Sequence, residues 1–289
     1  MQQDRIAATA FRTPKVSLSA AELRRELSGR NLALAEGMVH ESTFGAVPSV
    51  VYQEVDGEHG NFLAASYRRI CAAPDWRRRL KKCYTASRRV ARSGDLIRRE
   101  LDCANSSDAL LMNVFCYPGV TSRPGVCSLL GTEPGLRPEF GIRPGTPLAS
   151  GRADRTEIDM SLGHLLVEAK LTESDFQTAR HDLVLRYKEL EAVFDVNELT
   201  VCDAGFHSYQ LIRGVLAAQH RGQSFLLLCD GRRMDLSEAW YRIVRTVLSC
   251  ELRARLAILT WQELAAVLPR TVQKLLSRKF GIDPASSHA

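Results

Sequence analysis

Two patterns of apolar and polar residues alternate through the C-terminal two thirds of the chain. Short apolar runs typical of buried strands are separated by stretches in which apolar residues recur every three or four positions, as on one face of a helix. The runs that predict strands are 136–142, 156–162, 164–171, 197–203, 224–230 and 255–260. The periodic stretches that predict helices are 106–115, 173–190, 207–220, 235–248, 261–268 and 270–280. This alternation predicts an α/β protein with a mixed central sheet flanked by helices.

The two apolar runs on either side of Gly163 are separated by almost nothing else, and this predicts a tight β-hairpin. Residues 118–150 are rich in Gly and Pro and are either a linker or a set of turns around one short strand. Residues 106–115 begin with two serines suited to cap a helix, which Pro118 would stop.

The N-terminal third has a different pattern. Ser19 followed by Glu22 is a capping box at the start of a helix. A strand is expected to begin at Pro48, and helices are expected from Asn61 to about Glu100. We therefore predict a mainly helical, basic region over residues 1–104 and an α/β domain over residues 105–289.

Composition narrows the class of protein. No run approaches the roughly 18 apolar residues of a membrane span, and the first 15 residues lack the apolar stretch of a secretion signal. We expect a soluble, cytoplasmic protein that does not bind membranes. No two of the eight cysteines are spaced as C-x-x-C, so reduced, buried thiols are favoured over a zinc or iron–sulfur site.

Positive charge is concentrated in one segment. The chain carries a net charge of +6, whereas residues 75–100 hold ten Arg or Lys and three acids, a local net of +7. Such a cluster attracts a polyphosphate through counterion release, although a solvated helix face has the same composition. We interpret it as a nucleic-acid-binding segment, with Arg77, Arg78, Arg79, Lys81, Lys82, Arg88 and Arg89 as candidate contacts.

Three charged residues lie within the predicted hairpin. Asp159 is in the first strand, and Glu168 and Lys170 are two positions apart in the second, so they share a face. With the right register Asp159 faces them across the strands. Two converging carboxylates repel each other and favour a hard divalent cation, which polarises a phosphoryl oxygen and activates water. A neighbouring lysine orients that water or stabilises the developing negative charge.

The segment EIDMSLGHLLVEAK resembles the PD-(D/E)XK nuclease superfamily of restriction and recombination nucleases. Asp159 matches the metal-binding Asp of the motif, Glu168 the second acid and Lys170 the lysine, while Ile158 replaces the Pro before the first acid. The resemblance implies a restriction-endonuclease-like α-β-β-β-α-β core, with Mg²⁺ or Mn²⁺ held by Asp159 and Glu168. It covers about half of the chain.

The same resemblance implies accessory residues. A further acid from the first core helix or the strand after it would be Asp108 or Glu139, and the pattern leaves both open. Gln210 and Arg213 lie three apart on a predicted helix and could reach a phosphate or brace Glu168; an exposed polar face is the alternative.

We therefore predict a metal-dependent endonuclease that acts on DNA rather than RNA. The two alternatives are a catalytically inactive nucleic-acid-binding protein of the same fold and an α/β interaction protein whose charges are surface residues. Cutting both strands of a duplex with one active site requires a second subunit or a second event, and a homodimer is the first of these two options.

Overall fold

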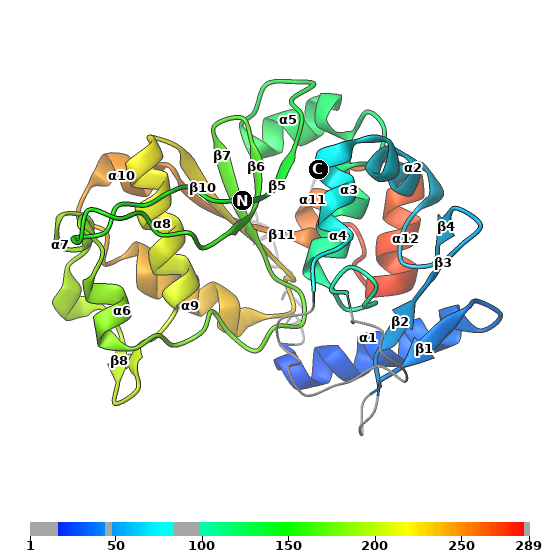
Figure 1. Ribbon diagram of the computed structural model, residues 1–289, viewed down its shortest axis with the longest axis horizontal. Helices are drawn as coiled ribbons and strands as arrows, with labels where there is room; N and C mark the ends of the chain where they lie inside the picture. Colours follow the sequence, from blue (N-terminus) through cyan, green and yellow to red (C-terminus); the bar gives the residue numbers. More distant parts are fainter. Residues whose placement is uncertain (1–16, 44–47, 84–98, 286–289) are drawn as a thin grey trace, which may run out of the picture.

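The computed structural model describes residues 17–43, 48–83 and 99–285. Its centre is a five-stranded mixed sheet with the strand order β11-β10-β7-β6-β5 (Figure 1). Strands β5, β6 and β7 are antiparallel neighbours, whereas β10 runs parallel to β7 and β11 parallel to β10. The strands are β5 (Glu139–Ile142), β6 (Ile158–Leu162), β7 (Leu165–Ala169), β10 (Ser224–Cys229) and β11 (Leu256–Thr260). The predicted α/β class is confirmed.

Helices cover both faces of this sheet, and each face has its own hydrophobic core. One core joins the sheet to α1 (Ala20–Ala35), α4 (Ser107–Phe115), α5 (Pro124–Leu130), α11 (Trp261–Val267) and α12 (Arg270–Phe280). The other joins it to α6 (His181–Leu185), α7 (Leu190–Val193), α8 (Tyr209–Arg221), α9 (Met234–Val244) and α10 (Cys250–Ala254). The two groups lie on opposite sides of the sheet in Figure 1.

The central strand β7 shows how the sequence pattern produces this layering. All five of its residues are buried. Leu165, Val167 and Ala169 belong to the core beneath α4 and α11, whereas Leu166 belongs to the core beneath α8. A strand with apolar residues at nearly every position must be covered on both faces. Glu168 lies on the α8 side of this strand.

Smaller elements complete the chain. A third hydrophobic cluster lies between α2 (Ala64–Ala72), α3 (Pro74–Arg79) and α4, and includes Tyr67, Trp76 and Met112. Three two-stranded pairs are β1–β2, β3–β4 and β8–β9: His40–Ser42 with Val50–Tyr52, Glu54–Val55 with Glu58–His59, and Val201–Cys202 with Gly205–Phe206. Single 3₁₀ turns lie at Val120–Ser122 and Val196–Glu198.

Several predicted helix boundaries are confirmed. The capping box of Ser19 and Glu22 is present at α1, and Ser106 caps α4 through the N–H of Ala109. Helix α4 ends at Phe115, before Pro118. The Gly and Pro residues of 118–150 form turns around β5 rather than a linker, but the sequence pattern missed α5 within them.

The helix predicted over 173–190 is wrong. Only α6 and the first residue of α7 fall within it, and residues 173–180 are irregular. Gln177 has a left-handed backbone conformation with φ 63°, which breaks a helix. The carbonyls of Phe176 and Gln177 instead accept the first N–H groups of α8, and Ala179 bridges to Phe206. Tertiary hydrogen bonds therefore override the local periodicity.

The helical prediction from Asn61 to Glu100 is only partly right. Helix α2 ends at Ala72 and α3 ends at Arg79, and Cys83 then forms an antiparallel bridge with Arg99. Residues 84–98 lie outside the described residues. No helix in the described part of the chain is long and apolar enough to cross a membrane.

Candidate active site

The candidate catalytic residues meet where β6 begins and β7 ends. The register pairs Met160 with Val167 and Ser161 with Leu166, and continuing it by one residue pairs Asp159 with Glu168. The tight turn that fixes this register contains Gly163 with φ 60°. The Asp159 carboxylate Oδ2 accepts the backbone N–H of Ala169 at 2.8 Å. The hairpin therefore places Asp159 beside the strand that carries Glu168.

Glu168 and Lys170 form a buried ion pair. The Lys170 Nζ donates to the Glu168 Oε1 at 2.8 Å. Glu168 is 2% exposed and Lys170 is 4% exposed. The Lys170 backbone is fixed as well, because its N–H donates to the carbonyl of Leu228 and its carbonyl accepts the indole N–H of Trp261. Strand β10, through Leu228, and helix α11, through Trp261, thus hold the lysine backbone in place.

The charge state of Lys170 follows from its surroundings. Burial alone lowers the pKa of an ammonium, but the carboxylates of Glu168, Glu173 and Asp159 outweigh burial and raise the pKa of Lys170 above its ordinary value. Lys170 is therefore a cation at neutral pH. A charged lysine stabilises negative charge and donates hydrogen bonds.

Asp159 has the opposite perturbation. Burial, the carboxylate of Glu168 and the carboxylate of Asp108 raise the pKa of Asp159 well above its ordinary value of 3.8, against the opposing effects of Lys170 and the Ala169 N–H. This shift reports that three acids lie near one another. Perturbed carboxylates of this kind are typical of functional sites, although structural ion networks also produce them.

Asp108 brings the basic segment to the hairpin. It lies in the first turn of α4, is 4% exposed, and accepts from Arg79 at 2.9 Å and from Lys82 at 2.7 Å. Arg79 also donates to Glu157 at 2.7 Å, two residues before Asp159. Residues about 80 positions apart in the sequence therefore share one ion network beside the candidate hairpin.

The predicted accessory residues are not all near this network. Arg213 is 6% exposed and donates to the backbone carbonyl of Glu157 at 2.9 Å, so it braces the start of β6 rather than Glu168. Gln210 is half-buried at the start of α8, and its N–H donates to Phe176. Glu139 is exposed and pairs with Ser161 across the sheet, two residues beyond Asp159. Of the two candidate acids, only Asp108 lies beside Asp159.

The basic segment divides into two sets. Arg77, Arg78 and Lys81 are exposed, and line a shallow depression with Cys71, Ala72 and Pro74. Arg79 and Lys82 instead turn inward to Asp108, which the sequence pattern did not anticipate. Arg88 and Arg89 lie outside the described residues.

Sequence reasoning missed Glu173. Its Oε1 accepts the hydroxyl of Ser107 at 2.6 Å, and its Oε2 accepts the N–H of Leu171 at 2.6 Å, so it ties the end of β7 to the start of α4. The fully buried Arg233 holds the same turn by donating to the carbonyls of Glu173 and Ser174. Glu173 lies in the segment that the sequence pattern predicts as a helix, so the pattern gives no sign of its approach to Lys170.

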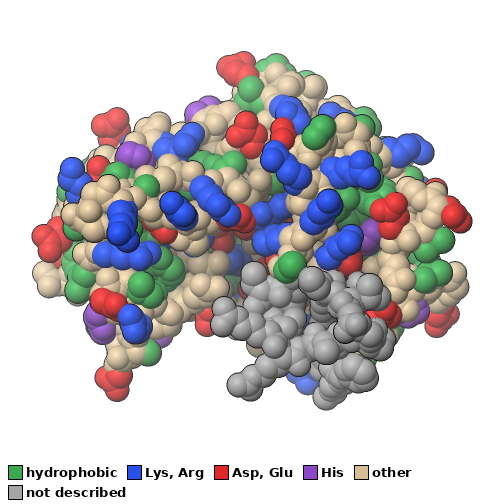
Figure 2. Space-filling model, in the orientation of Figure 1, with side chains coloured by type: hydrophobic (Ala, Val, Ile, Leu, Met, Phe, Trp, Pro, Cys, Tyr) green, Lys and Arg blue, Asp and Glu red, His purple; other side chains and the backbone are tan. Residues whose placement is uncertain are grey.

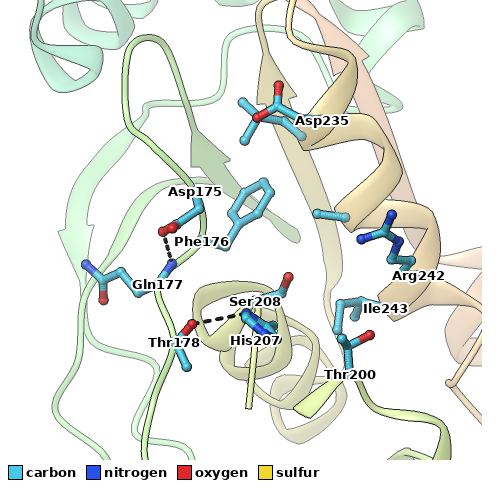
Figure 3. A pocket seen from close by; sticks show the side chains of 12 residues that line it. Asp175, Phe176, Gln177, Thr178, Thr200, His207, Ser208, Asp235, Arg242 and Ile243 are labelled. Carbon is cyan, nitrogen blue, oxygen red and sulfur yellow. Dashed lines mark hydrogen bonds between the residues drawn. The ribbon is translucent and has the colours of Figure 1, made fainter. Parts of the chain in front are cut away.

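A cavity of about 270 Å³ opens next to Phe176 and is lined on one side by residues 175–178 of the loop that follows β7 (Figure 3). The Phe176 ring centroid is 5.8 Å from the Lys170 Nζ. Thr178 and His207 form a hydrogen bond of 3.1 Å at the cavity wall, and α9 supplies Arg242 and Ile243 opposite them. The cavity thus adjoins the structure that supports Lys170 without containing any of the three hairpin residues.

The carboxylates and thiols of the described residues offer few metal ligands and no grouped set of them. Across residues 17–43, 48–83 and 99–285, no group of three or more His, Cys, Asp and Glu side chains is arranged to hold a metal ion. The hairpin offers two carboxylates, from Asp159 and Glu168. Cys116 and Cys229 are buried, and burial raises the pKa of both thiols, that of Cys229 to about 12. These two thiols pack as apolar side chains, as expected for buried cysteines.

Comparison with protein families gives one match, over residues 29–281, to the family described as "Restriction Endonuclease associating with ARP". The chain belongs to this restriction-endonuclease-like family. Comparisons with curated proteins and with solved structures found no match. The family match includes the N-terminal helices as well as the sheet, and so spans both sides of the predicted boundary at residue 104.

Proposed function

We propose that this protein is a divalent-metal-dependent nuclease that hydrolyses phosphodiester bonds in DNA, with a PD-(D/E)XK core. The observation that carries the proposal is the position of the Asp159 carboxylate, which accepts the Ala169 N–H of β7, between the buried, ion-paired Glu168 and Lys170. The elements α4, β5, β6, β7, α8 and β10 follow the α-β-β-β-α-β order of that core, with α5 inserted before β5 and with α6, α7, β8 and β9 inserted before α8. Membership of a restriction-endonuclease-like family supports the same reaction class.

The residues present fit a hard divalent cation. Glu168 and Asp108 raise the pKa of Asp159 because clustered carboxylates repel one another, and a dication relieves that repulsion. Asp159 and Glu168 would hold Mg²⁺ or Mn²⁺, which supplies Lewis-acid activation of a phosphoryl oxygen and of water. Asp108 is paired with Arg79 and Lys82 and would not contact the metal. Its charge would instead affect the protonation of Asp159.

The protein's own residues have separate tasks in this reaction. Lys170, charged and held by Glu168, donates to a phosphate oxygen and stabilises the negative charge that develops as the bond to the leaving oxygen breaks. Arg213 and Arg79 fix Glu157, and with it the backbone that presents Asp159. Exposed Arg77, Arg78 and Lys81 bind the phosphate backbone without sequence preference. A cytoplasmic location and a homodimer that cuts both strands complete the proposal.

Cleavage of supercoiled plasmid tests the function. We expect the wild-type protein with Mg²⁺ to nick or linearise the plasmid, and Asp159→Ala and Lys170→Ala each to lower the rate at least about 100-fold. Asp182→Ala, which removes an exposed acid on α6, is the matched control and should retain full activity. Cleavage that persists in EDTA, or in Asp159→Ala, contradicts the proposal.

An inactive nucleic-acid-binding protein is the second candidate. The observation that favours it is the Glu168 carboxylate itself, which is almost fully buried and already neutralised by Lys170 at 2.8 Å. Mn²⁺ binding distinguishes the two. A nuclease binds Mn²⁺ with an affinity that falls in Asp159→Ala, whereas the inactive protein binds DNA in a salt-sensitive manner without Asp159-dependent Mn²⁺ binding.

A further inference from the structure

Residues 143–157 form the loop that joins β5 to β6. This loop lies at the end of the strands that carries Asp159, Glu168 and Lys170. Ile142 pairs with Ile158, so β5 ends where β6 begins, and Asp159 follows directly. The strands β7 and β10 also end at this edge, because β7 is antiparallel to β6 and parallel to β10. Both ends of this loop therefore lie at the end of the strands that carries Asp159, Glu168 and Lys170.

The basic side chains of the loop are exposed to solvent, whereas its acidic side chains are bound to other residues. Arg143, Arg152 and Arg155 are all exposed. Its only two acids are Asp154 and Glu157, and both are engaged. Asp154 is 8% exposed and accepts from the Tyr187 hydroxyl at 2.6 Å and from Thr156 at 2.6 Å.

Glu157 is shared between Arg79 at 2.7 Å and Arg143 at 3.3 Å. The Arg143 contact is long and exposed, so it contributes little and leaves this guanidinium able to bind a phosphate instead. Within the described residues, neither Arg152 nor Arg155 forms an ion pair. The surface of the loop is therefore positive.

The loop is held in a fixed conformation. Its own backbone closes a turn through the Leu148 N–H and the Arg152 carbonyl, and Asp154 donates from its N–H to Thr146. It is also fastened to the segment before α7, where Ala149 donates to the Arg186 carbonyl and Tyr187 bonds to Asp154. Arginines on a rigid loop lose less entropy on binding than arginines on a free one.

The loop and α3 lie on either side of one shared residue. Arg79 of α3 contacts Glu157 through one oxygen and Arg143 contacts it through the other, so the positive surfaces of α3 and of the loop join there. Lys and Arg side chains gather across the middle of the face shown in Figure 2, between the two groups of helices. A continuous positive surface beside the catalytic hairpin matches the spaced charges of a phosphate backbone.

We propose that the loop 143–157 is a second nucleic-acid-binding surface, which holds the DNA backbone with Arg143, Arg152 and Arg155 beside the site of cleavage. Together with α3, the loop binds the DNA phosphate backbone at two places, one on each side of the shared Glu157. This inference rests on the proposed nuclease function, because it assigns the partner of the same site. It gives the protein phosphate contacts that the sequence alone did not indicate, since the three arginines are scattered among Gly and Pro.

Salt-dependent binding of a labelled DNA duplex of roughly 25 base pairs, measured in EDTA so that nothing is cut, tests the proposal. We expect the variant R143Q/R152Q/R155Q to bind on the order of 100-fold more weakly than wild type at about 0.1 M salt, with the slope of log K against log salt reduced by two to three. A circular dichroism spectrum and a melting temperature equal to those of wild type establish that the variant is folded.

The matched control removes three arginines that precede the starts of β10 and β11, at the opposite end of the strands. Arg221 ends α8 just before β10 begins, and Arg245 and Arg253 precede the start of β11; all three are exposed. R221Q/R245Q/R253Q changes the net charge equally and should retain most of the affinity. Equal losses in both variants, or a wild-type slope in R143Q/R152Q/R155Q, overturn the proposed surface.

The outcome is separable from the nuclease proposal. Wild-type cleavage together with unchanged binding by R143Q/R152Q/R155Q refutes the loop surface and leaves the nuclease intact. Arginine-dependent binding by a wild-type protein that does not cut supports the surface and refutes the nuclease.

Discussion

At the scale of single residues, the site contains charges whose energies oppose folding. Asp159 is crowded by Glu168 and Asp108, and its carboxylate is compensated by one backbone N–H and by the nearby Lys170. A neutral side chain of the same shape relieves this repulsion, so removing the charge should stabilise the fold. Under the proposed function, the same change should also weaken Mn²⁺ binding.

The variant Asp159→Asn tests this trade-off. The amide oxygen still accepts the Ala169 N–H, so we expect stabilisation by roughly 1–3 kcal/mol at pH 8. The pKa of Asp159 is raised above 3.8 in the folded protein, so its proton binds more tightly there and wild-type stability falls as pH rises through that window. The advantage of the variant should thus be largest above the folded pKa and disappear below pH 3.8. Urea denaturation across this range measures it, and a constant difference at every pH contradicts the assignment.

At the scale of elements, close packing of α8 on the sheet positions Arg213. A Cβ added at Gly214 would lie 2.2 Å from the Phe225 ring of β10, which no side chain tolerates without a shift. Gly214 thus lets α8 approach the sheet closely enough for Arg213 to reach the Glu157 carbonyl. The close approach explains a glycine in the middle of a helix, where it otherwise costs stability.

Gly214→Ala is expected to destabilise the protein by about 1–3 kcal/mol, because the buried Phe225 ring must move. Thermal unfolding measures the change. Gly29→Ala in α1 is the control, since nothing lies within 4 Å of its added Cβ and alanine is the better helix former, which should stabilise by about 0.5–1 kcal/mol. If Gly214→Ala is as stable as Gly29→Ala, the contact between α8 and β10 is not tight.

At the scale of the whole molecule, the two ends of the described chain pack together. Leu23 and Leu27 of α1 share a core with Val272 and Leu276 of α12. Lys279 of α12 is buried and donates to the backbone carbonyl and side-chain oxygen of Asn61. The division at residue 104 stays a prediction, and these contacts mean that the two regions fold against each other.

Lys279 should make the stability of the whole fold depend on pH. Burial lowers its pKa from 10.5 to about 7, so the unfolded chain binds a proton more tightly than the folded protein between these values. Stability therefore rises with pH across this window, by up to about 1.4 kcal/mol per pH unit, and the penalty is complete below pH 7.

Guanidinium denaturation at pH 7, 8, 9 and 10 measures this slope. Lys279→Met should flatten it relative to wild type, whereas Lys274→Met, which removes an exposed lysine from the same helix, should leave it unchanged. Identical slopes in wild type and Lys279→Met would show that Lys279 stays charged in the folded protein.

The sequence alone determined what depends on neighbours along the chain. Strand and helix periodicity, the Gly163 turn and the two-residue spacing of Glu168 and Lys170 were enough to place three charged residues on one hairpin. Local hydrogen bonds and side-chain alternation fix such features, and both can be read within about ten residues.

Only the tertiary structure decided the surroundings of that hairpin. The turning of Arg79 and Lys82 toward Asp108 and Glu157, and the tie of Glu173 to Ser107, depend on partners 26 to 78 residues away. The loss of the helix over 173–180 likewise depends on hydrogen bonds to α8 and to Phe206. Such contacts form because buried charges and backbone groups must find partners wherever the fold provides them, and no local pattern records which partner that is.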